Sequence, residues 1–369
     1  MSNVRRGEGP IEQDQIEQAQ ERRYPQVAVV IPAHNAMAYL PETLASVLSQ
    51  TYQNFEVLIV DDGSEDDLQG WYAQLSEPVK SKVRLLSQNN QGTCRARNAG
   101  IAATHSPYVA FLDADDIWLP QKLERQVALL SNSPEVSLVY CWSATIDSVG
   151  EHLGRMYAGR LQRNVWAGLL VKNVISTPSA VLVRRSCLEA VGGFDTDLFA
   201  YIEDKDLWLR IARSHQIATM PEVLMHKRRH PFSMSNHWAA MEKASYRVID
   251  KALRSPPSAL SDRTLQVLRR KSYAEVNRQM AWKPLQTESI DIRVSFRYLK
   301  KAWRYRPLFV LSKESFKLLF VMVTISLVGP RRYLQGLRRI GKLRQIISQY
   351  KRLPIPGRRA DSDPIRCEP

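Results

Sequence analysis

Short apolar runs alternate with helix-like segments over the first third of the chain. Four runs of five or six residues are apolar almost throughout, and they span 27–31, 55–60, 83–87 and 108–112. Runs of this kind are typical of parallel strands that are buried on both faces of a sheet. Between the first two, apolar residues recur at the spacing of one helix face, at Leu40, Leu44, Val47 and Leu48. Strands that alternate with helices predict βαβ units, that is, an α/β fold with a mostly parallel sheet flanked by helices.

Polar clusters follow three of these runs directly, at 33–35 (AHN), 61–64 (DDGS) and 113–116 (DADD). Ligands of such sheets bind outside the carboxyl ends of the strands, so the clusters are expected to line one edge. The third cluster places three carboxylates in four positions, where they repel one another. Mg²⁺ and Mn²⁺ prefer oxygen ligands, and alternate side chains of an extended segment lie on the same side of it. Asp113 and Asp115 are therefore predicted to bind one divalent cation.

Neither acidic cluster is specific by itself. A D-x-D after an apolar strand is also typical of haloacid-dehalogenase-type phosphatases, although these have Thr or Val four positions after the first Asp, where this chain has Ile117. They also place the motif near the start of the domain. The VDDGS stretch could also form the acidic pocket of a response regulator, but no phospho-acceptor context follows it. A solvated turn is the simplest alternative for either cluster.

Six motifs in a fixed order narrow this choice. In order, they are VVIPAHNAMAYLPETLASVLSQTY, FEVLIVDDGSEDD, NQGTCRARNAGIAAT, YVAFLDADD, VGGFD and EDKDLWLRIA. Together they closely resemble glycosyltransferase family 2, the inverting enzymes of the GT-A fold, over about residues 26–237. The resemblance implies a GT-A domain at 25–238, which lies between a mobile polar leader at 1–24 and a helical, basic region at 239–369.

The resemblance implies a binding site for a nucleotide-sugar, with a UDP-sugar as the expected donor. The implied nucleotide-binding residues are Pro32, Ala33, His34, Asn35, Asp61, Gly92, Arg97 and Asp113. Among them, His34 stands where the family commonly has an aromatic Tyr, and Asp61 matches the carboxylate that accepts from the uracil imide. Asp62 is expected to cap the following turn instead. Arg97 either screens the diphosphate or pins the acidic loops to each other.

The resemblance also implies a divalent metal, Mn²⁺ or Mg²⁺, and a catalytic base. The implied metal ligands are Asp115, Asp113 and His230, with Asp116 behind them or as a helix cap. The pair Glu203-Asp204 matches the carboxylates that supply the base, and Asp204 is expected to take the proton of the acceptor hydroxyl. The alternative is that both acids cap the helix predicted over 205–213.

Several further residues have a structural and a functional interpretation. Arg228 or His230, in a basic stretch before a serine-rich turn, would close over the phosphates, although such stretches are commonly solvated. Asp206 and Arg210 are four positions apart on a predicted helix and are expected to form a structural ion pair. Three tryptophans are expected in the core rather than in acceptor subsites, namely Trp118, Trp142 and Trp208.

The net charge of +15 belongs almost entirely to the C-terminal part, since residues 290–369 contain 19 basic and 5 acidic side chains. The apolar run at 318–328 would be about 16 Å long as a helix, against a hydrocarbon core of ~30 Å, so no membrane span is expected. Residues 333–351 combine an apolar stripe with basic positions, which is typical of a helix at a membrane surface. Binding to nucleic acid is the alternative explanation for this charge. No nucleic-acid-binding motif accompanies it, so no nucleic-acid partner is expected.

The leader lacks the apolar stretch of a secretory signal, and the four cysteines are too widely spaced for a metal site or a CxxC pair. Unpaired thiols in a reducing cytoplasm are therefore expected. The prediction as a whole is a cytoplasmic glycosyltransferase at the inner face of the membrane, which transfers a sugar to a hydroxyl of a sugar or lipid-linked acceptor. A non-catalytic family member that binds only the nucleotide is the remaining alternative.

Overall fold

The computed structural model describes residues 24–198, 202–230, 238–257, 260–285, 290–333 and 335–336. The chain divides into two compact units, 1–322 and 323–369. Except for Tyr24, the predicted leader lies outside the described residues. Most of the predicted amphipathic helix at 333–351 and Cys367 also lie outside them.

The described part of the first unit contains a nine-stranded sheet in the order β3-β2-β1-β4-β8-β6-β9-β5, with β7 paired to β6. Four parallel strands form one half of it: β1 (Val27–Ala33), β2 (Phe55–Asp62), β3 (Val83–Gln88) and β4 (Tyr108–Phe111). They coincide with the four apolar runs, so the predicted α/β architecture is confirmed. The polar clusters at 33–35 and 61–64 begin where β1 and β2 end.

The other half of the sheet is mixed. Its strands are β8 (Val181–Arg184), β6 (Val136–Ile146), β9 (Gln216–Arg228), β5 (Ile117–Trp118) and β7 (His152–Tyr157). Strand β9 runs parallel to β6, whereas β8 is antiparallel to both β4 and β6. Only residues 112–116 separate β4 in the middle of the sheet from β5 at its edge, so the sheet curls back on itself. The DADD cluster lies in this short connection.

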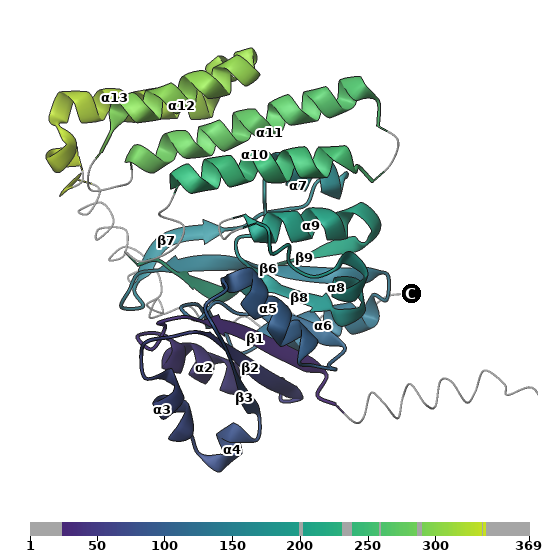
Figure 1. Ribbon diagram of the computed structural model, residues 1–369. Coiled ribbons are helices and arrows are strands. Elements are labelled where there is room, and N and C mark those ends of the chain that lie inside the picture. Colours follow the sequence, from purple (N-terminus) through teal and green to yellow (C-terminus); the bar gives the residue numbers. More distant parts are fainter. Residues whose placement is uncertain are drawn as a thin grey trace, which may run out of the picture. The chain divides into compact units, whose positions relative to one another are not determined.

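Helices cover both faces of the sheet (Figure 1). Those of the N-terminal part are α2 (Leu40–Leu48), α3 (Leu68–Ala73), α4 (Glu77–Lys80), α5 (Thr93–Ala102), α6 (Lys122–Asn132), α7 (Val165–Val171), α8 (Arg185–Val191) and α9 (Glu203–Ser214), with a 3₁₀ turn at Pro178–Ala180. Helix α5 packs on β1 and β2 so closely that a Cβ atom at Gly100 would clash with Val30. This close contact explains why α5 carries a glycine in its interior despite the cost of glycine in a helix.

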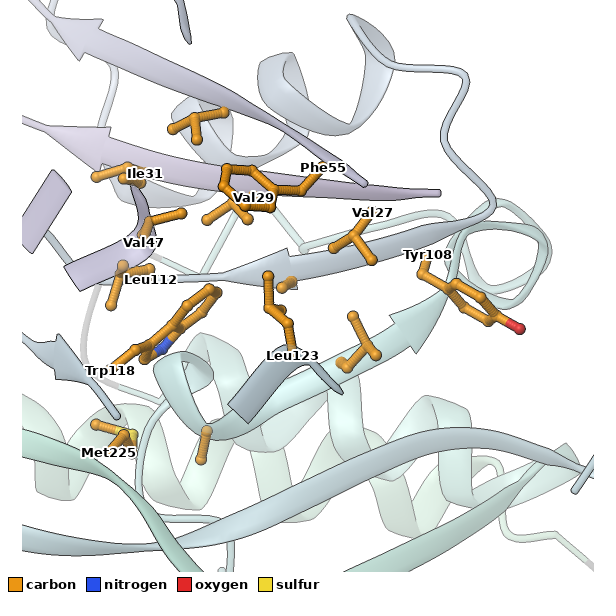
Figure 2. Packing of buried hydrophobic residues seen from close by; sticks show 14 of the residues in the cluster. Val27, Val29, Ile31, Val47, Phe55, Tyr108, Leu112, Trp118, Leu123 and Met225 are labelled. Atoms are coloured by element: carbon orange, nitrogen blue, oxygen red, sulfur yellow. The ribbon is translucent and has the colours of Figure 1, made fainter. Parts of the chain in front are cut away.

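The core lies on the opposite face of β1 from α5. Figure 2 shows Val27, Val29 and Ile31 of this strand together with Val47 of α2 and Leu123 of α6. Their side chains are at most 2% exposed, and so are those of Ala28 and Val30. Burial on both faces is what a continuous apolar run requires, because it has no polar side to turn to water. Trp118 and Trp208 are buried as predicted, whereas Trp142 is half-buried.

The helices after β9 continue the first unit: α10 (Trp238–Arg254), α11 (Asp262–Trp282), a 3₁₀ turn at Lys283–Leu285, α12 (Ile292–Tyr305), a second 3₁₀ turn at Pro307–Leu311, and α13 (Lys313–Val328), whose last turns enter the second unit. Helix α10 packs on α9, and α11 packs on α7, α10 and α12 (Figure 1). Lys251 of α10 forms ion pairs with Asp195 (2.5 Å) and with Asp206 of α9 (2.8 Å). Asp206 also pairs with Arg210 (2.8 Å), so that predicted ion pair is confirmed.

Helix α13 contains the apolar run at 318–328. Leu318 and Ile325 are buried, whereas Phe316, Phe320 and Leu327 are exposed. Among the described residues, no helix is both long and apolar enough to cross a membrane. Cys94, Cys141 and Cys187 are buried and form no disulfide.

Candidate active site

Three loops at the carboxyl ends of the parallel strands contact one another. Asn35, whose φ of 51° is left-handed, accepts a hydrogen bond from the Glu65 backbone N–H (2.7 Å), while its own N–H donates to Ser64 Oγ (3.1 Å). His34 Nε2 lies 3.2 Å from Asn90 Nδ2. The loops after β1, β2 and β3 therefore form one continuous polar edge, to which the predicted clusters at 33–35 and 61–64 contribute.

The two aspartates of the VDDGS stretch have different partners. Asp61 accepts from the Ser64 backbone N–H (2.9 Å), which closes the turn that follows β2. Asp62 accepts from the backbone N–H groups of Gln91 and Gly92, both at 2.8 Å, and thus fixes the loop after β3. Asp62 was predicted to cap its own turn, but its partners lie about 30 positions away along the chain.

Gly92 begins α5 with a φ of 88°, a left-handed conformation that favours glycine. No atom lies within 4 Å of the position that a Cβ would occupy there, so the backbone faces open space. A ligand can therefore approach the backbone closely here, although the N–H of Gly92 itself donates to Asp62. This geometry suits the position expected beside the ribose and phosphates.

Arg97 is 2% exposed and joins two acidic motifs. One guanidinium nitrogen donates to Asp113 Oδ1 and another to Glu203 Oε1, both at 2.8 Å. The two carboxylates raise the pKa of Arg97 against the opposing effect of its burial, so the group stays charged. Of the two predicted roles, pinning the acidic loops agrees with this geometry.

The three aspartates of the DADD cluster point to three different partners. Asp113 accepts from Arg97 and, through its other oxygen, from Thr177 Oγ1 (2.8 Å). Asp116 is buried and accepts from Ser179 Oγ (2.6 Å) and from the Arg228 backbone N–H (3.0 Å). Burial, followed by the charges of Asp115 and Asp113, raises the pKa of Asp116 well above its usual value. Asp116 thus ties the loop to β9 and is not available to a ligand.

Asp115 is the aspartate that faces His230, with 2.9 Å between Oδ2 and Nε2. The ring of Tyr39 lies 5.0 Å from the imidazole of His230 and limits its orientation. A carboxylate oxygen beside an imidazole nitrogen is a donor set that Mn²⁺ accepts, and nucleotide phosphates can supply further oxygens. The described residues contain no group of three or more His, Cys, Asp or Glu placed to hold a metal. Asp115 and His230 are two neighbouring side chains that could ligate one metal.

Arg228 does not reach toward a ligand. Its side chain is 1% exposed and donates to Glu42 Oε2 (2.6 Å) and to the backbone carbonyl of Asp115 (2.9 Å), among others. Successive side chains of a strand point to opposite faces of the sheet. Arg228 is therefore buried on one face of β9, and its neighbour Lys227 lies on the other.

Asp204 stands in the first turn of α9 and is partly exposed. Its Oδ2 accepts from Asn173 Nδ2 (3.2 Å), and its Oδ1 accepts from the Lys205 backbone N–H (2.6 Å). Burial, followed by the negative charge of Glu203, raises the pKa of Asp204 to about 6. The residue before α9 is Ile202, which provides no side-chain cap, and Glu203 is engaged by Arg97. Of the two acids, Glu203 is therefore held by Arg97, whereas Asp204 accepts from a first-turn N–H of α9, as the capping alternative expects.

Sequence reasoning missed a segment that organises the site. Residues 173–179 supply Asn173 to Asp204, Thr177 to Asp113 and Ser179 to Asp116. The backbone carbonyl of Ser176 accepts from Lys227 Nζ (3.1 Å), which brings an ammonium group to the same place. The only signal in the sequence was a group of small hydroxyl residues immediately before a buried strand.

Known proteins are similar to this chain in sequence and in fold. Residues 28–192 match the family model of glycosyl transferase family 2. The chain is 33% identical over 230 residues to the uncharacterized glycosyltransferase alr2836 of Nostoc sp., which covers 59% of this chain and 69% of that protein. Other curated relatives are matched over 17% to 66% of their own length.

Two solved structures have the same fold. TarS 1-349 of S. aureus in complex with UDP superposes with a TM-score of 0.53 at 17% identity, over 89% of this chain and 94% of TarS. The mannosyltransferase PcManGT of Pyrobaculum calidifontis, in complex with GDP-Man and Mn²⁺, superposes with a TM-score of 0.55 at 16% identity, over 93% of this chain and 95% of PcManGT. The fold is thus that of a GT-A glycosyltransferase. The chain belongs to glycosyltransferase family 2, as its motifs predicted.

Proposed function

We propose that this protein is an inverting glycosyltransferase that moves a sugar from a nucleotide-sugar to an acceptor hydroxyl by a single displacement. The observation that carries the proposal is that Asp113 and Asp204 are both held by one segment, through Thr177 and Asn173. A donor-side carboxylate and a carboxylate suited to proton transfer are thereby kept in a fixed relation. Single displacement requires this relation, because attack and departure occur in the same step.

The donor lies along the polar edge, with the base and ribose against the loop at 32–35, Asp61 and Gly92. We propose a UDP-sugar, with Asp61 at the end of β2 as the acceptor for an imide N–H through Oδ2, since its Oδ1 already accepts from the Ser64 N–H. The UDP complex of TarS supports this choice, whereas the GDP-Man complex of PcManGT makes guanine the alternative base. Asp113 faces the ribose, and Arg97 holds Asp113 in place.

Asp115 and His230 would hold a divalent cation, Mn²⁺ or Mg²⁺, at the diphosphate. Such an ion supplies positive charge that stabilises the departing nucleoside diphosphate. The Mn²⁺ complex of PcManGT supports this assignment. The remaining lone pairs of Asp113 leave it able to contribute as well, as its D-x-D position suggests.

Asp204 acts as the base that accepts the proton of the acceptor hydroxyl. Its raised pKa of about 6 keeps it ionised at neutral pH while making it a stronger base than an ordinary aspartate. The bond from Asn173 and the bond from the Lys205 N–H fix both of its oxygens in position. The alternative of a protein that binds nucleotide without transfer is disfavoured, since it needs no such carboxylate.

The basic C-terminal region places the enzyme at the inner face of the membrane, where a lipid-linked or cell-surface acceptor is made. Each Lys or Arg near an anionic surface contributes about 1 kcal/mol, so the 19 basic residues of 290–369 provide reversible attachment. No nucleic-acid partner is proposed.

Calorimetric titration with UDP, GDP, CDP and dTDP, each with and without Mn²⁺, tests the donor site. We expect one nucleotide, UDP, to bind at least about tenfold more tightly with Mn²⁺ than without it, because charge-assisted contacts to a phosphate are strong. If no nucleotide binds under any of these conditions, the acidic cluster is structural and the proposed function fails.

A further inference from the structure

Helix α12 presents a basic face to solvent. Five Lys and Arg residues recur along it at spacings of three or four positions, which places them on one side of the helix. These exposed residues are Arg293, Arg297, Lys300, Lys301 and Arg304. The opposite side of the helix packs into the protein, through Ser295, Tyr298, Leu299 and Ala302. The positive charge of this part of the chain is therefore arranged as one face of a folded element.

Few carboxylates accompany this face. Residues 293–317 contain eight Lys and Arg residues, all exposed, and one acidic residue, Glu314. Glu314 is itself 3.6 Å from Arg278 of α11. Within the described part of the chain, Lys301 is the one of the eight that pairs with a carboxylate, 2.9 Å from Glu242. Neighbouring like charges on a helix repel one another, so this face favours an anionic partner.

Two exposed leucines lie in the 3₁₀ turn that follows α12. Leu308 and Leu311 are 78% and 70% exposed. Residues three apart in a 3₁₀ helix lie one above the other, so both leucines are on the same side of the turn. Phe316, in the first turn of α13, is 57% exposed. Apolar groups of this kind, rimmed by polar side chains, mark interaction surfaces.

Ser315 holds the turn and the start of α13 against the end of α12. Its Oγ donates to the backbone carbonyl of Phe309 in the turn (2.6 Å) and accepts from Trp303 Nε1 of α12 (3.1 Å). Exposed cations lie on either side of the apolar residues along the chain, at Arg304, Arg306, Lys313 and Lys317. Basic and apolar side chains thus belong to one surface of the first unit.

This combination selects one kind of partner. A second copy of the chain would bring two sets of these cations together. The segment 337–369 contains nine basic and three acidic residues, so its charge is repelled as well. Nucleic acid would bind the cations but leave the leucines and Phe316 in water. An anionic bilayer matches both parts, because its headgroups attract Lys and Arg and its interface accepts apolar side chains.

We infer that α12, the turn at Pro307–Leu311 and the start of α13 form a membrane-docking surface, on which Leu308, Leu311 and Phe316 enter the interface of an anionic bilayer. The basic face of α12 attracts the lipid headgroups. The inference rests on the membrane location proposed above and deepens it, because it assigns the contact to one surface and adds apolar insertion to charge attraction. It does not depend on the donor site.

Co-sedimentation of the full chain with phosphatidylglycerol vesicles at about 100 mM NaCl tests the apolar part of this surface. The triple variant Leu308→Ser/Leu311→Ser/Phe316→Ser should bind at least about tenfold more weakly than the wild type, since the apolar area removed from water contributes to binding.

Two controls accompany this variant. Val149→Ser/Leu153→Ser/Met156→Ser replaces three exposed apolar residues in and beside β7, and it should bind like the wild type. A conservative variant of the docking surface should also keep its binding, because its apolar area is retained: Leu308→Met/Leu311→Met/Phe316→Leu.

The double variant Arg293→Gln/Arg297→Gln tests the basic face in the same assay. It should bind about tenfold more weakly, because each cation near an anionic surface contributes to the attraction. Arg125→Gln/Arg213→Gln removes the same charge from exposed positions of α6 and α9, and it should bind like the wild type.

Wild-type binding by the triple Ser variant, or an equal loss in its β7 control, overturns the inference while the general membrane location stands. Absence of wild-type binding to these vesicles overturns both. A wild-type dimer in gel filtration that the triple Ser variant converts into a monomer assigns the surface to a second copy instead. Urea denaturation of each variant guards against loss through misfolding. UDP binding, which tests the transferase proposal, should stay unchanged in all of them.

Discussion

Arg97 and Glu203 form a buried ion pair with 2.8 Å between nitrogen and oxygen, although 106 positions separate them along the chain. The same guanidinium holds Asp113, so the DADD loop and the start of α9 share one positive charge. Asp113 and Glu203, the neighbour of the proposed base Asp204, thus depend on a single buried side chain.

Replacing Arg97 is therefore expected to affect stability first. Arg97→Ala leaves two carboxylates without their buried partner and should lower the free energy of unfolding by about 3–5 kcal/mol. Arg84→Ala is the matched control: it removes an ion pair with Glu56 in which the arginine side chain is 52% exposed, and should cost less than about 1 kcal/mol. Urea denaturation measures both. If Arg97→Ala keeps wild-type stability and loses UDP binding, Arg97 screens the diphosphate instead.

Metal dependence should follow Asp115 and His230. In Asp115→Ala and in His230→Ala, the affinity for UDP in the presence of Mn²⁺ should fall by at least about tenfold toward the value measured in EDTA. Each variant removes one of the two proposed protein ligands of the metal. Glu65→Gln, a variant of an exposed residue on the same edge, serves as the control for a general change in charge. Calorimetry with and without Mn²⁺ gives both affinities, and an unchanged response to Mn²⁺ in the two variants would remove these residues from the metal site.

Asp204→Asn should lower the turnover of the donor by about 10²–10⁴-fold while UDP still binds. The wild-type rate should rise about tenfold per pH unit below pH 6 and level off above it, because the base works only when ionised and its pKa is raised to about 6. The residual rate of the variant should lack this rise. Glu77→Gln, whose side chain is 87% exposed and far along the chain, provides the control. A variant that retained the wild-type rate and pH profile would show that another group accepts the proton.

The basic C-terminal region should bind the full chain to anionic vesicles. Co-sedimentation with vesicles that contain phosphatidylglycerol should decrease steeply between about 50 and 500 mM NaCl, because salt screens the attraction between basic side chains and an anionic surface. Neutral vesicles are the control. A gel shift with nucleic acid at low salt, without any vesicle binding, would favour the nucleic-acid alternative.

The parallel half of the sheet could be predicted because its strands are continuously apolar, and this pattern has few explanations other than burial on both faces. The helix predicted over 205–213 is observed at Glu203–Ser214, and it was predictable because Leu207 and Ile211 lie on one helix face. Asp206 and Arg210 were predictable as a pair because a helix fixes their distance.

The partners of the site residues were not predictable in this way. Thr177 reaches Asp113 across 64 positions and Asn173 reaches Asp204 across 31, and neither contact leaves a local pattern. From the sequence, Asp62 was predicted to cap the turn that follows it, because an aspartate after a strand commonly forms local hydrogen bonds. Its bonds to the loop after β3 exist only because β2 and β3 are neighbours in the sheet.

The most direct test of the account is the stereochemistry of transfer. The protein with Mn²⁺ should be supplied with a panel of α-linked UDP-sugars in water, and the first sugar released should be followed by proton NMR. Water replaces the acceptor in this reaction, and single displacement with Asp204 as base predicts the β anomer as the initial product. Release of the α anomer would contradict the proposed single displacement.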